Sequence, residues 1–168
     1  MSARVTVALR PMLPADAPLL AGIFRASVVG LTGEDYSPAQ QDAWISTADD
    51  EAAFAARRAK ELTLIATIDR APVGFASLKG DDHIEMLYVH PGAARKGVAK
   101  ALIDALETLA AARGTTRITA DASDTARDFF AHRGYVAQRR NTFEVNGEWI
   151  ANTSMEKVLT PVQRGPLQ

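Results

Sequence analysis

The chain has 168 residues, of which 47% are hydrophobic, and its 19 basic and 20 acidic residues leave a formal net charge of −1. This length and hydrophobic content predict a single domain with a buried core, and the near-neutral charge argues against nucleic acid as a main partner. The absence of cysteine excludes disulfides, thiolate metal sites and a cysteine nucleophile.

The N-terminal third predicts one strand followed by helices. Val5–Arg10 alternates in polarity and stops at a proline, so it is expected to be a strand. Asp16 is expected to cap a helix. The apolar face of that helix would contain Leu19, Leu20, Ile23, Phe24 and Val28. A short helix is then expected over residues 38–44, capped by Ser37, and another over residues 50–60.

The central part predicts three antiparallel strands and a long helix. Leu62–Ile68 and Val73–Leu78 are rich in branched apolar residues and are expected to form a hairpin through the four residues between them. Ile84–Val89 predicts a central strand, which a proline-containing turn ends. From Val98 the apolar spacing becomes helical, and Gly114 is expected to end this helix.

The C-terminal part predicts three more strands and one helix. These strands are expected over residues 117–122, 135–145 and 148–157. The first follows a helix and should therefore lie parallel to the central strand, and Ser123 is expected to cap a helix over residues 124–133. Asn146 and Gly147 between the last two strands are a strong hairpin signal. Residues 160–168 are expected to form a mobile tail.

The turn between the central strand and the long helix suits an anion. Between Gly92 and Gly97 it contains only alanines and cations, so several backbone amides can converge at the helix N-terminus without bulky side chains. Arg95, Lys96 and Lys100 add positive charge, which favours a phosphate group. A simpler explanation is a tight turn whose small residues only permit packing.

Two spaced motifs cover this turn and the helix that follows the next strand. The first is Leu87-Tyr88-Val89-His90-Pro91 followed by Ala94-Arg95-Lys96-Gly97-Val98-Ala99, and the second, about thirty residues later, is Ser123–Tyr135. Together they resemble the fingerprint of the GNAT superfamily of acyl-CoA-dependent N-acetyltransferases. Ala94 departs from the usual Gln or Arg. Because the family's loop binds through backbone amides, we expect weaker affinity rather than lost function.

The resemblance implies an α/β (α+β) fold of the GNAT type over residues 1–159. Its sheet would be mixed and mostly antiparallel, with about seven strands, a splayed parallel pair and four to five flanking helices. It also implies acetyl-CoA as co-substrate, without a metal, in a cleft where the parallel strands diverge beside a bulge. The cofactor-binding residues implied are Leu87, Tyr88, Val89, Ala94, Arg95, Lys96, Gly97, Val98, Ala99, Lys100, Ser123, Phe129, Phe130 and Arg133.

Acetyl transfer requires a neutral amine. A lysine-like amine titrates near pH 10.4, so its deprotonation at pH 7 costs about 4.6 kcal/mol unless the site removes the proton. In the family, an acid on the central strand often acts as the base, commonly through water. Glu85 is the first candidate for this catalytic role and His83 the second, with Asp121 on the neighbouring strand. A salt bridge on the strand surface would explain Glu85 as a structural residue.

Phe130 stands where the family usually has a tyrosine that acts as general acid to the leaving thiolate. Phenylalanine cannot donate a proton. Because thiols titrate near pH 8.5, coenzyme A thiolate is a tolerable leaving group and water could replace the acid. Core packing alone could also explain both Phe129 and Phe130.

The sequence does not identify the amine acceptor. Tyr36 and Trp44 are expected to bind it, since aromatic side chains among carboxylates suit a cationic amine. Two alternatives stay open. One is a GNAT-shaped module that binds acyl-CoA without turnover, which Phe130 and Ala94 favour. The other is a Rossmann-like or flavodoxin-like nucleotide binder, which the antiparallel strands oppose.

No apolar run approaches the roughly 20 residues that a membrane-spanning helix needs, and Met1–Arg4 is not followed by the apolar region of a signal peptide. The sequence therefore predicts a cytoplasmic transferase whose partners are acetyl-CoA and an amine, not a membrane or nucleic acid. A homodimer is left open.

Overall fold

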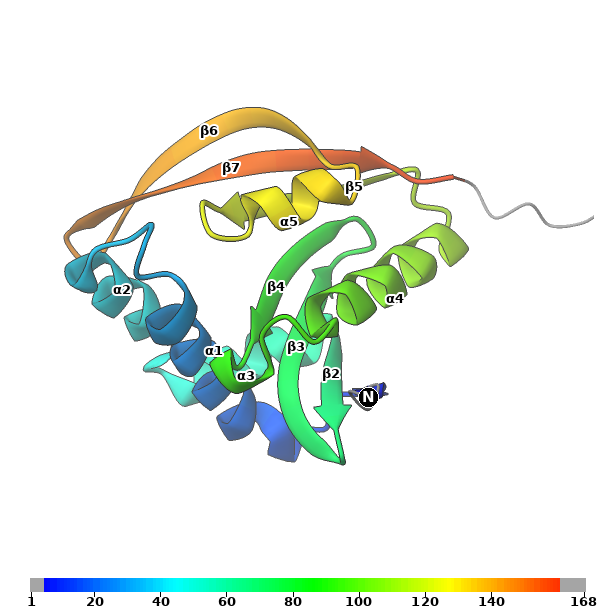
Figure 1. Ribbon diagram of the computed structural model, residues 1–168, viewed down its shortest axis with the longest axis horizontal. Helices are drawn as coiled ribbons and strands as arrows, with labels where there is room; N and C mark the ends of the chain where they lie inside the picture. Colours follow the sequence, from blue (N-terminus) through cyan, green and yellow to red (C-terminus); the bar gives the residue numbers. More distant parts are fainter. Residues whose placement is uncertain (1–4, 161–168) are drawn as a thin grey trace, which may run out of the picture.

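The computed structural model describes residues 5–160, in which seven strands form one sheet in the order β1-β2-β3-β4-β5-β7-β6. Neighbouring strands pair antiparallel except β4 and β5, which are parallel. The strands are β1 (Val7–Pro11), β2 (Leu62–Ile68), β3 (Ala71–Lys79), β4 (His83–Val89), β5 (Arg117–Ser123), β6 (Val136–Val145) and β7 (Glu148–Val158). The α-helices are α1 (Ala17–Leu31), α2 (Pro38–Ile45), α3 (Glu51–Lys60), α4 (Val98–Ala112) and α5 (Arg127–His132). This confirms the predicted mixed sheet with flanking helices (Figure 1).

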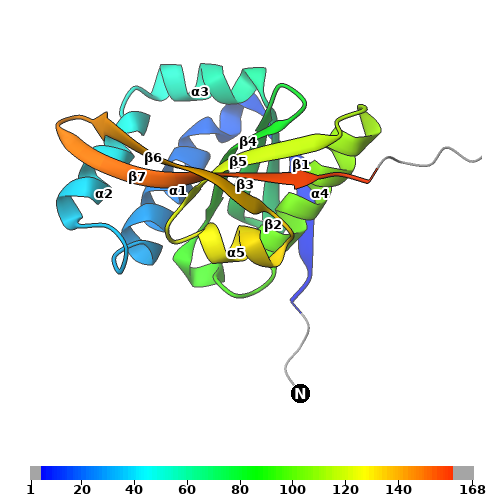
Figure 2. The same ribbon diagram turned by 90° about the horizontal axis from the view of Figure 1, so that it is seen from above.

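Helices cover both faces of the half of the sheet that contains β1 to β4. On one face, Phe24 of α1 packs in a cluster with Ile65 and Phe75. On the other, Leu102 of α4 packs in a cluster with Ala66. Figure 2 shows α3 and α5 on opposite sides of the strands. Because both faces are covered, β2 and β3 need apolar residues at successive positions, which explains their continuous apolar runs.

The other half of the sheet, formed by β5, β7 and β6, is covered on one face only. Ile118 and Met155 on that face belong to the same cluster as α4. The opposite face is polar and carries Thr119, Asp121 and Ser154. Figure 1 shows β6 and β7 as a long curved hairpin whose turn lies beside α2. The first half of the sheet is therefore covered on both faces, whereas the second half has one polar face that is open to solvent.

Asp16 precedes α1, but the predicted side-chain cap is wrong. Its carboxylate makes no hydrogen bond to that helix. Instead it accepts hydrogen bonds from Arg10 at 2.8 and 3.0 Å and from the amide of Leu13 at 2.7 Å, because a guanidinium fork binds a carboxylate through two charge-assisted bonds. Leu19, predicted on the apolar face, is 43% exposed, while its neighbour Leu20 is fully buried.

The turn between β2 and β3 is shorter than predicted. Asp69 and Arg70 form it alone, both with left-handed φ values of +51° and +68°. Pro72, predicted in the loop, lies inside β3 and pairs with Thr67 beside a register shift. A bulge tolerates proline because the ladder there does not need every backbone donor.

Helix α5 begins at Arg127 rather than at the predicted residue 124. Ser123 makes a cap-like contact, since its Oγ accepts the amide of Ala126 at 3.1 Å, but this bond closes a turn that precedes the helix. Other turn predictions are confirmed: Gly114 after α4 has φ +90°, and Asn146 in the hairpin turn has φ +46°.

Within residues 5–160, no helix is both long and apolar enough to cross a membrane. The tail predicted over residues 160–168 lies outside the described residues, except for Thr160.

Candidate active site

β4 and β5 diverge soon after they meet. They pair in parallel only at His83↔Thr119 and Ile84↔Ala120, although both strands continue for several residues. Beyond Ile84, the backbone groups of β4 that face β5 therefore have no partner strand in the described structure. Unpaired strand edges keep hydrogen-bonding capacity, so this splay can accept a bound chain that carries amides.

A β-bulge lies at Glu85, immediately after this parallel pairing. β3 pairs with Ile84 and then with Met86 at successive positions, so Glu85 is the extra residue. The bulge shifts the alternation of side chains along β4. This shift is seen in the packing, since Ile84 and Leu87 both contact the α4 cluster. In a regular strand, residues three apart would point to opposite faces. The bulge thus turns the apolar residues inward on both sides while Glu85 stays exposed.

A cleft of about 300 Å³ lies where the two strands part. Its walls come from β4, β5, α2, α5 and the β6–β7 hairpin. Among the residues predicted for the site, those that line the cleft are His83, Glu85, Leu87, Tyr88, Ser123, Phe130, Tyr36 and Trp44. Those that lie outside its lining are Val89, Ala94, Arg95, Lys96, Gly97, Val98, Ala99, Lys100, Phe129 and Arg133. The cleft therefore gathers the predicted catalytic and acceptor-binding residues, with the predicted phosphate-binding residues beyond it.

His83, Glu85 and Asp121 form an acid cluster in this cleft. The Nε2 atom of His83 lies 3.6 Å from Oε2 of Glu85 and 3.8 Å from Oδ2 of Asp121. Its Nδ1 atom lies 2.8 Å from the hydroxyl of Thr119, and Oδ1 of Asp121 accepts a hydrogen bond from Ser154 at 2.7 Å. These contacts hold the ring and one carboxylate in place. Among residues 5–160, no group of histidine and acidic side chains could hold a metal ion.

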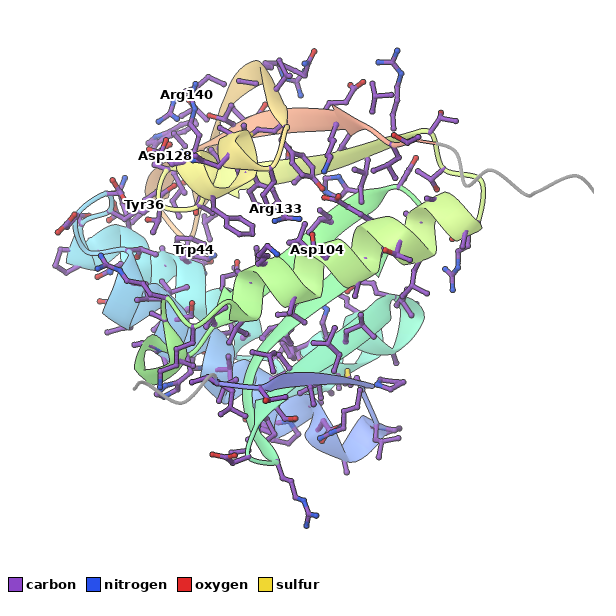
Figure 3. The ribbon with its side chains drawn as sticks, turned by 45° about the vertical axis from the view of Figure 1, so that its right-hand side comes forward. Tyr36, Trp44, Asp104, Asp128, Arg133 and Arg140 are labelled. Carbon is purple, nitrogen blue, oxygen red and sulfur yellow. The ribbon has the colours of Figure 1, made fainter. Side chains whose placement is uncertain are left out.

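Tyr36 and Trp44 lie together at one wall of the cleft (Figure 3), with ring centroids 5.2 Å apart. The Tyr36 hydroxyl donates to the carbonyl of Ala151 at 2.8 Å and accepts from the amide of Asp124 at 2.9 Å. Burial raises the pKa of Tyr36. Both hydrogen bonds of the hydroxyl are therefore made within the protein, to β7 and to the β5–α5 loop. The ring of Tyr36 is the part that can contact an acceptor.

Tyr88 extends this aromatic wall into the core. Its ring lies 6.3 Å from Trp44, edge-on to Phe24 at 4.7 Å, and 5.8 Å from Phe75. Burial raises the pKa of Tyr88 to about 12. The phenol therefore stays neutral at pH 7.

The β4–α4 turn (residues 91–97) presents the N-terminus of α4. Arg95 and Gly97 both have left-handed φ values, +62° and +81°. The first bond of the helix runs from the amide of Ala101 to the carbonyl of Gly97 at 3.0 Å, so the amides between them have no acceptor within the helix. Arg95 and Lys96 are exposed beside these amides. This is the geometry of an anion-binding helix terminus.

Arg133, which directly follows α5, is paired with Asp104 of α4, as Figure 3 shows, and its guanidinium carbon lies 5.8 Å from the ring centre of Phe129. Lys100 lies 3.7 Å from the other oxygen of Asp104. One carboxylate therefore engages two of the predicted cofactor-binding cations. Phe130 is 3% exposed and its ring lies 5.4 Å from Phe129, so it belongs to the core while it also lines the cleft.

The β6–β7 hairpin contributes cleft residues that the sequence pattern did not reveal. They are Phe143, Val145, Ile150, Ala151 and Asn152. The Asn-Gly signal predicted the hairpin itself. Two features decide which face of the hairpin meets the cleft: a register shift between Ala137 and Arg139 and the packing of the turn near α2. Neither can be derived from the alternation of polar and apolar residues in the sequence. Asp121, in contrast, was expected on the strand beside the candidate bases, and it lines the cleft.

The splayed parallel pair, the bulged strand and the glycine-containing turn into α4 are the arrangement that the GNAT resemblance predicts. The family model of the acetyltransferase (GNAT) domain matches residues 32–159. The chain is also 34% identical over 149 residues to the Escherichia coli (strain K12) protein named "Uncharacterized N-acetyltransferase YafP", covering 89% of this chain and 94% of that protein. The chain therefore belongs to the GNAT family of N-acetyltransferases.

Solved structures agree with this assignment. A crystal structure of a GCN5-related N-acetyltransferase from Rhodopseudomonas palustris has a TM-score of 0.91 and 60% identity, covering 95% of this chain and 99% of that chain. PaiA N-acetyltransferase from Thermoplasma acidophilum, in complex with coenzyme A, has a TM-score of 0.76 and 18% identity, covering 91% and 99%. YncA from Salmonella typhimurium, with acetyl-CoA, has a TM-score of 0.62 and 20% identity, covering 92% and 94%. The last two show the fold alone.

Proposed function

We propose that this enzyme transfers the acetyl group of acetyl-CoA to a primary amine by direct attack within a ternary complex. The observation that carries the proposal is the arrangement along β4. Glu85 on the bulge and the unpaired edge of β4 face one cleft, and the same strand leads directly into the β4–α4 turn. One strand can therefore align an activated acyl group with a base. We also propose that residues 1–159 act as a single acetyltransferase domain.

The residues present fit acetyl-CoA at two points. The amides that follow Arg95 and Gly97 at the N-terminus of α4 suit a diphosphate, and the exposed Arg95 and Lys96 add positive charge. The unpaired edge of β4 near Leu87 suits the amide-bearing pantetheine arm. Ser123 and Phe130 would line the thioester side. Two distant relatives of the same fold are solved with coenzyme A or acetyl-CoA, which supports this choice of donor.

The acid cluster suits proton removal from the acceptor. Glu85 would take the proton from the ammonium group, directly or through water, and His83 is the second candidate. The neutral amine then attacks the thioester carbonyl carbon and forms the new carbon–nitrogen bond, the carbon–sulfur bond breaks, and the thiolate leaves while the nitrogen gives its remaining surplus proton to water. Because Phe130 cannot donate a proton, water would protonate the thiolate.

A crystal structure of the protein soaked with saturating acetyl-CoA, together with an assay of thiol release on addition of amines, tests the proposal. We expect the diphosphate on the amides of residues 95–99 and the thioester beside Glu85. Binding elsewhere, or no binding, would overturn the proposal. Binding without acetyl transfer to any amine would instead favour a module that holds acyl-CoA without turnover.

A further inference from the structure

The charges that face the cleft have one sign. Its lining includes the carboxylates of Glu85 and Asp121 and, within residues 5–160, no lysine or arginine. The side chains of Glu85 and Asp121 are 35% and 49% exposed, so both can meet a ligand. A cleft lined by negative charge concentrates cations and repels acids. An acceptor that carries its own carboxylate or phosphate would therefore be disfavoured in this space.

The carboxylate oxygens of the acid cluster keep free capacity as acceptors. The distances of 3.6 and 3.8 Å from Nε2 of His83 to Glu85 and Asp121 are too long for hydrogen bonds. The other oxygen of Asp121 is held by Ser154 at 2.7 Å, which fixes the direction of the unbonded one. An ammonium group has three donors and no acceptor. The space beside His83 thus suits an ammonium group shared by two carboxylates.

The same cleft also has an apolar wall. Trp44, Phe143 and Ile150 line it, and Phe143 is 38% exposed although it is a large apolar side chain. The hairpin that carries Phe143 and Ile150 is attached to α2, because the side-chain amide of Gln40 donates a hydrogen bond to the carbonyl of Trp149 at 2.8 Å. An aromatic wall held in this way is ready to receive a flat or branched apolar group without prior ordering.

We infer that the acceptor is a primary amine with an aromatic or branched apolar body and no acidic group. Its ammonium group would lie between Glu85 and Asp121, and its body against Trp44 and Phe143. The inference rests on the proposed function and names the substrate class of the same site.

Glu85 also lines a second hollow, which offers the main competing arrangement. It is lined by Arg57, Lys60 and Lys79, together with Arg58 and Glu61, which pair with each other at 2.6 Å. An acidic group on the acceptor would meet cations there rather than in the cleft. The aromatic residues of the cleft are absent from its lining, so the two hollows select for different acceptors and the experiment can separate them.

Three matched acceptors test the inference in a thiol-release assay with acetyl-CoA. 2-Phenylethylamine has the ring and the amine, phenylalanine adds a carboxylate, and ethylamine lacks the ring. We expect kcat/KM for 2-phenylethylamine to exceed that of each of the others by about 30-fold or more. A preference for phenylalanine or ethylamine, or transfer to none of the three despite acetyl-CoA binding, overturns the inference. Failure to bind acetyl-CoA removes the proposed function and this inference with it.

Variants of the two walls sharpen the test. Phe143→Ala should raise KM for 2-phenylethylamine about tenfold, and Asp121→Asn should do the same, with KM for acetyl-CoA unchanged in both. Trp149→Ala is the matched control, because Trp149 is 61% exposed on the same hairpin and lies outside the cleft lining. Thermal unfolding confirms that each variant folds. If Trp149→Ala raises KM as much as Phe143→Ala, the apolar wall does not bind the acceptor.

Discussion

The two ends of β4 carry different kinds of chemistry. At its C-terminal end, the β4–α4 turn offers backbone amides whose directions depend on left-handed φ values at Arg95 and Gly97. At its N-terminal end, the acid cluster offers side chains, with the carboxylates of Glu85 and Asp121 both near Nε2 of His83. The turn should therefore tolerate changes of side chain but not of backbone, and the acid cluster should show the reverse.

The two ends are also held in place differently. The turn depends on close packing, since a Cβ atom at Gly74 would lie 2.8 Å from Cγ1 of Val98, and one at Gly30 would lie 2.4 Å from Cγ of Pro91. The acid cluster depends on hydrogen bonds, such as that between His83 and Thr119 at 2.8 Å. Small residues far away in the sequence thus position the turn, whereas polar partners across the sheet position the acid cluster.

The largest effect is expected from Glu85→Gln. Glutamine keeps the shape of the side chain but cannot accept the proton of the acceptor, so kcat should fall by about 100-fold to 10,000-fold. Acetyl-CoA affinity, measured by isothermal titration calorimetry, should not change, because the proposed cofactor contacts are backbone groups at the other end of the strand. Glu144→Gln is the control, since Glu144 is exposed on β6 outside the cleft. An unchanged kcat would move the base to His83 or Asp121.

The second effect concerns the backbone of the turn. Gly97 and Gly114 lie at opposite ends of α4 with φ values of +81° and +90°, and a Cβ atom added at either residue would meet no other part of the fold within 4 Å. Substitution of either by alanine should therefore cost a similar ~1–2 kcal/mol of unfolding free energy. Only Gly97→Ala should weaken acetyl-CoA binding, by about tenfold.

Lys96→Ala completes this comparison of backbone and side chain. The charge of Lys96 is exposed and screened by salt, so its removal should weaken acetyl-CoA binding by no more than about threefold at 0.15 M salt. Calorimetric titrations of the three variants check the order. A larger loss in Lys96→Ala than in Gly97→Ala would mean that side-chain charge, not the backbone, holds the diphosphate.

The contrast between the β4–α4 turn and the acid cluster also explains what could be predicted from the sequence. The turn was visible because glycine, proline and the onset of helical spacing are local signals, and Gly97 has the left-handed φ that such a turn requires. The members of the acid cluster could be named from the sequence, since Glu85 and His83 lie on one strand and Asp121 lies on the strand expected beside it. The distances between them could not be predicted, because these depend on a parallel pairing of only two residue pairs and on the exact position of the bulge at Glu85.

Side-chain partners across the fold were the least predictable features. Tyr36 was expected to bind the acceptor, yet its hydroxyl is taken by Ala151 and Asp124. Arg133 was expected at the cofactor, and its guanidinium is paired with Asp104 on α4. In both cases the sequence shows a residue that can make strong polar contacts. The choice of partner depends on the packing of α4, α5 and β7.

A smaller effect is expected from Phe130→Tyr, which adds a hydroxyl at the thioester side of the cleft. If water protonates the leaving thiolate, the added phenol should leave kcat intact or raise it by no more than about threefold. Because Phe130 is 3% exposed, the melting temperature must be measured alongside to show that the new hydroxyl finds a partner. A large loss of kcat in a fully folded variant would contradict this account of the leaving group.

The smallest effect concerns the ion pair that joins the β5–α5 loop to β6. The two Nη atoms of Arg140 donate to the two carboxylate oxygens of Asp124 at 2.6 and 2.9 Å, and this hydrogen bonding holds the pKa of Asp124 below its usual value. A lowered pKa in the folded state means that the stabilisation is complete above the unfolded-state pKa of about 3.9 and is lost as the pH falls through the folded-state value.

Asp124→Asn should therefore lower the melting temperature at pH 7 by about 1–3 °C, because the pair is partly exposed. The difference from the unmodified protein should disappear as the pH falls below the folded-state pKa of Asp124, where the carboxylate is already protonated. Asp42→Asn, an equal charge change at an exposed position on α2, should show no such convergence. The amide of Asp124 still donates to Tyr36 in the variant, so kcat should not change. A fall in kcat would mean that this pair positions the site and does more than support the fold.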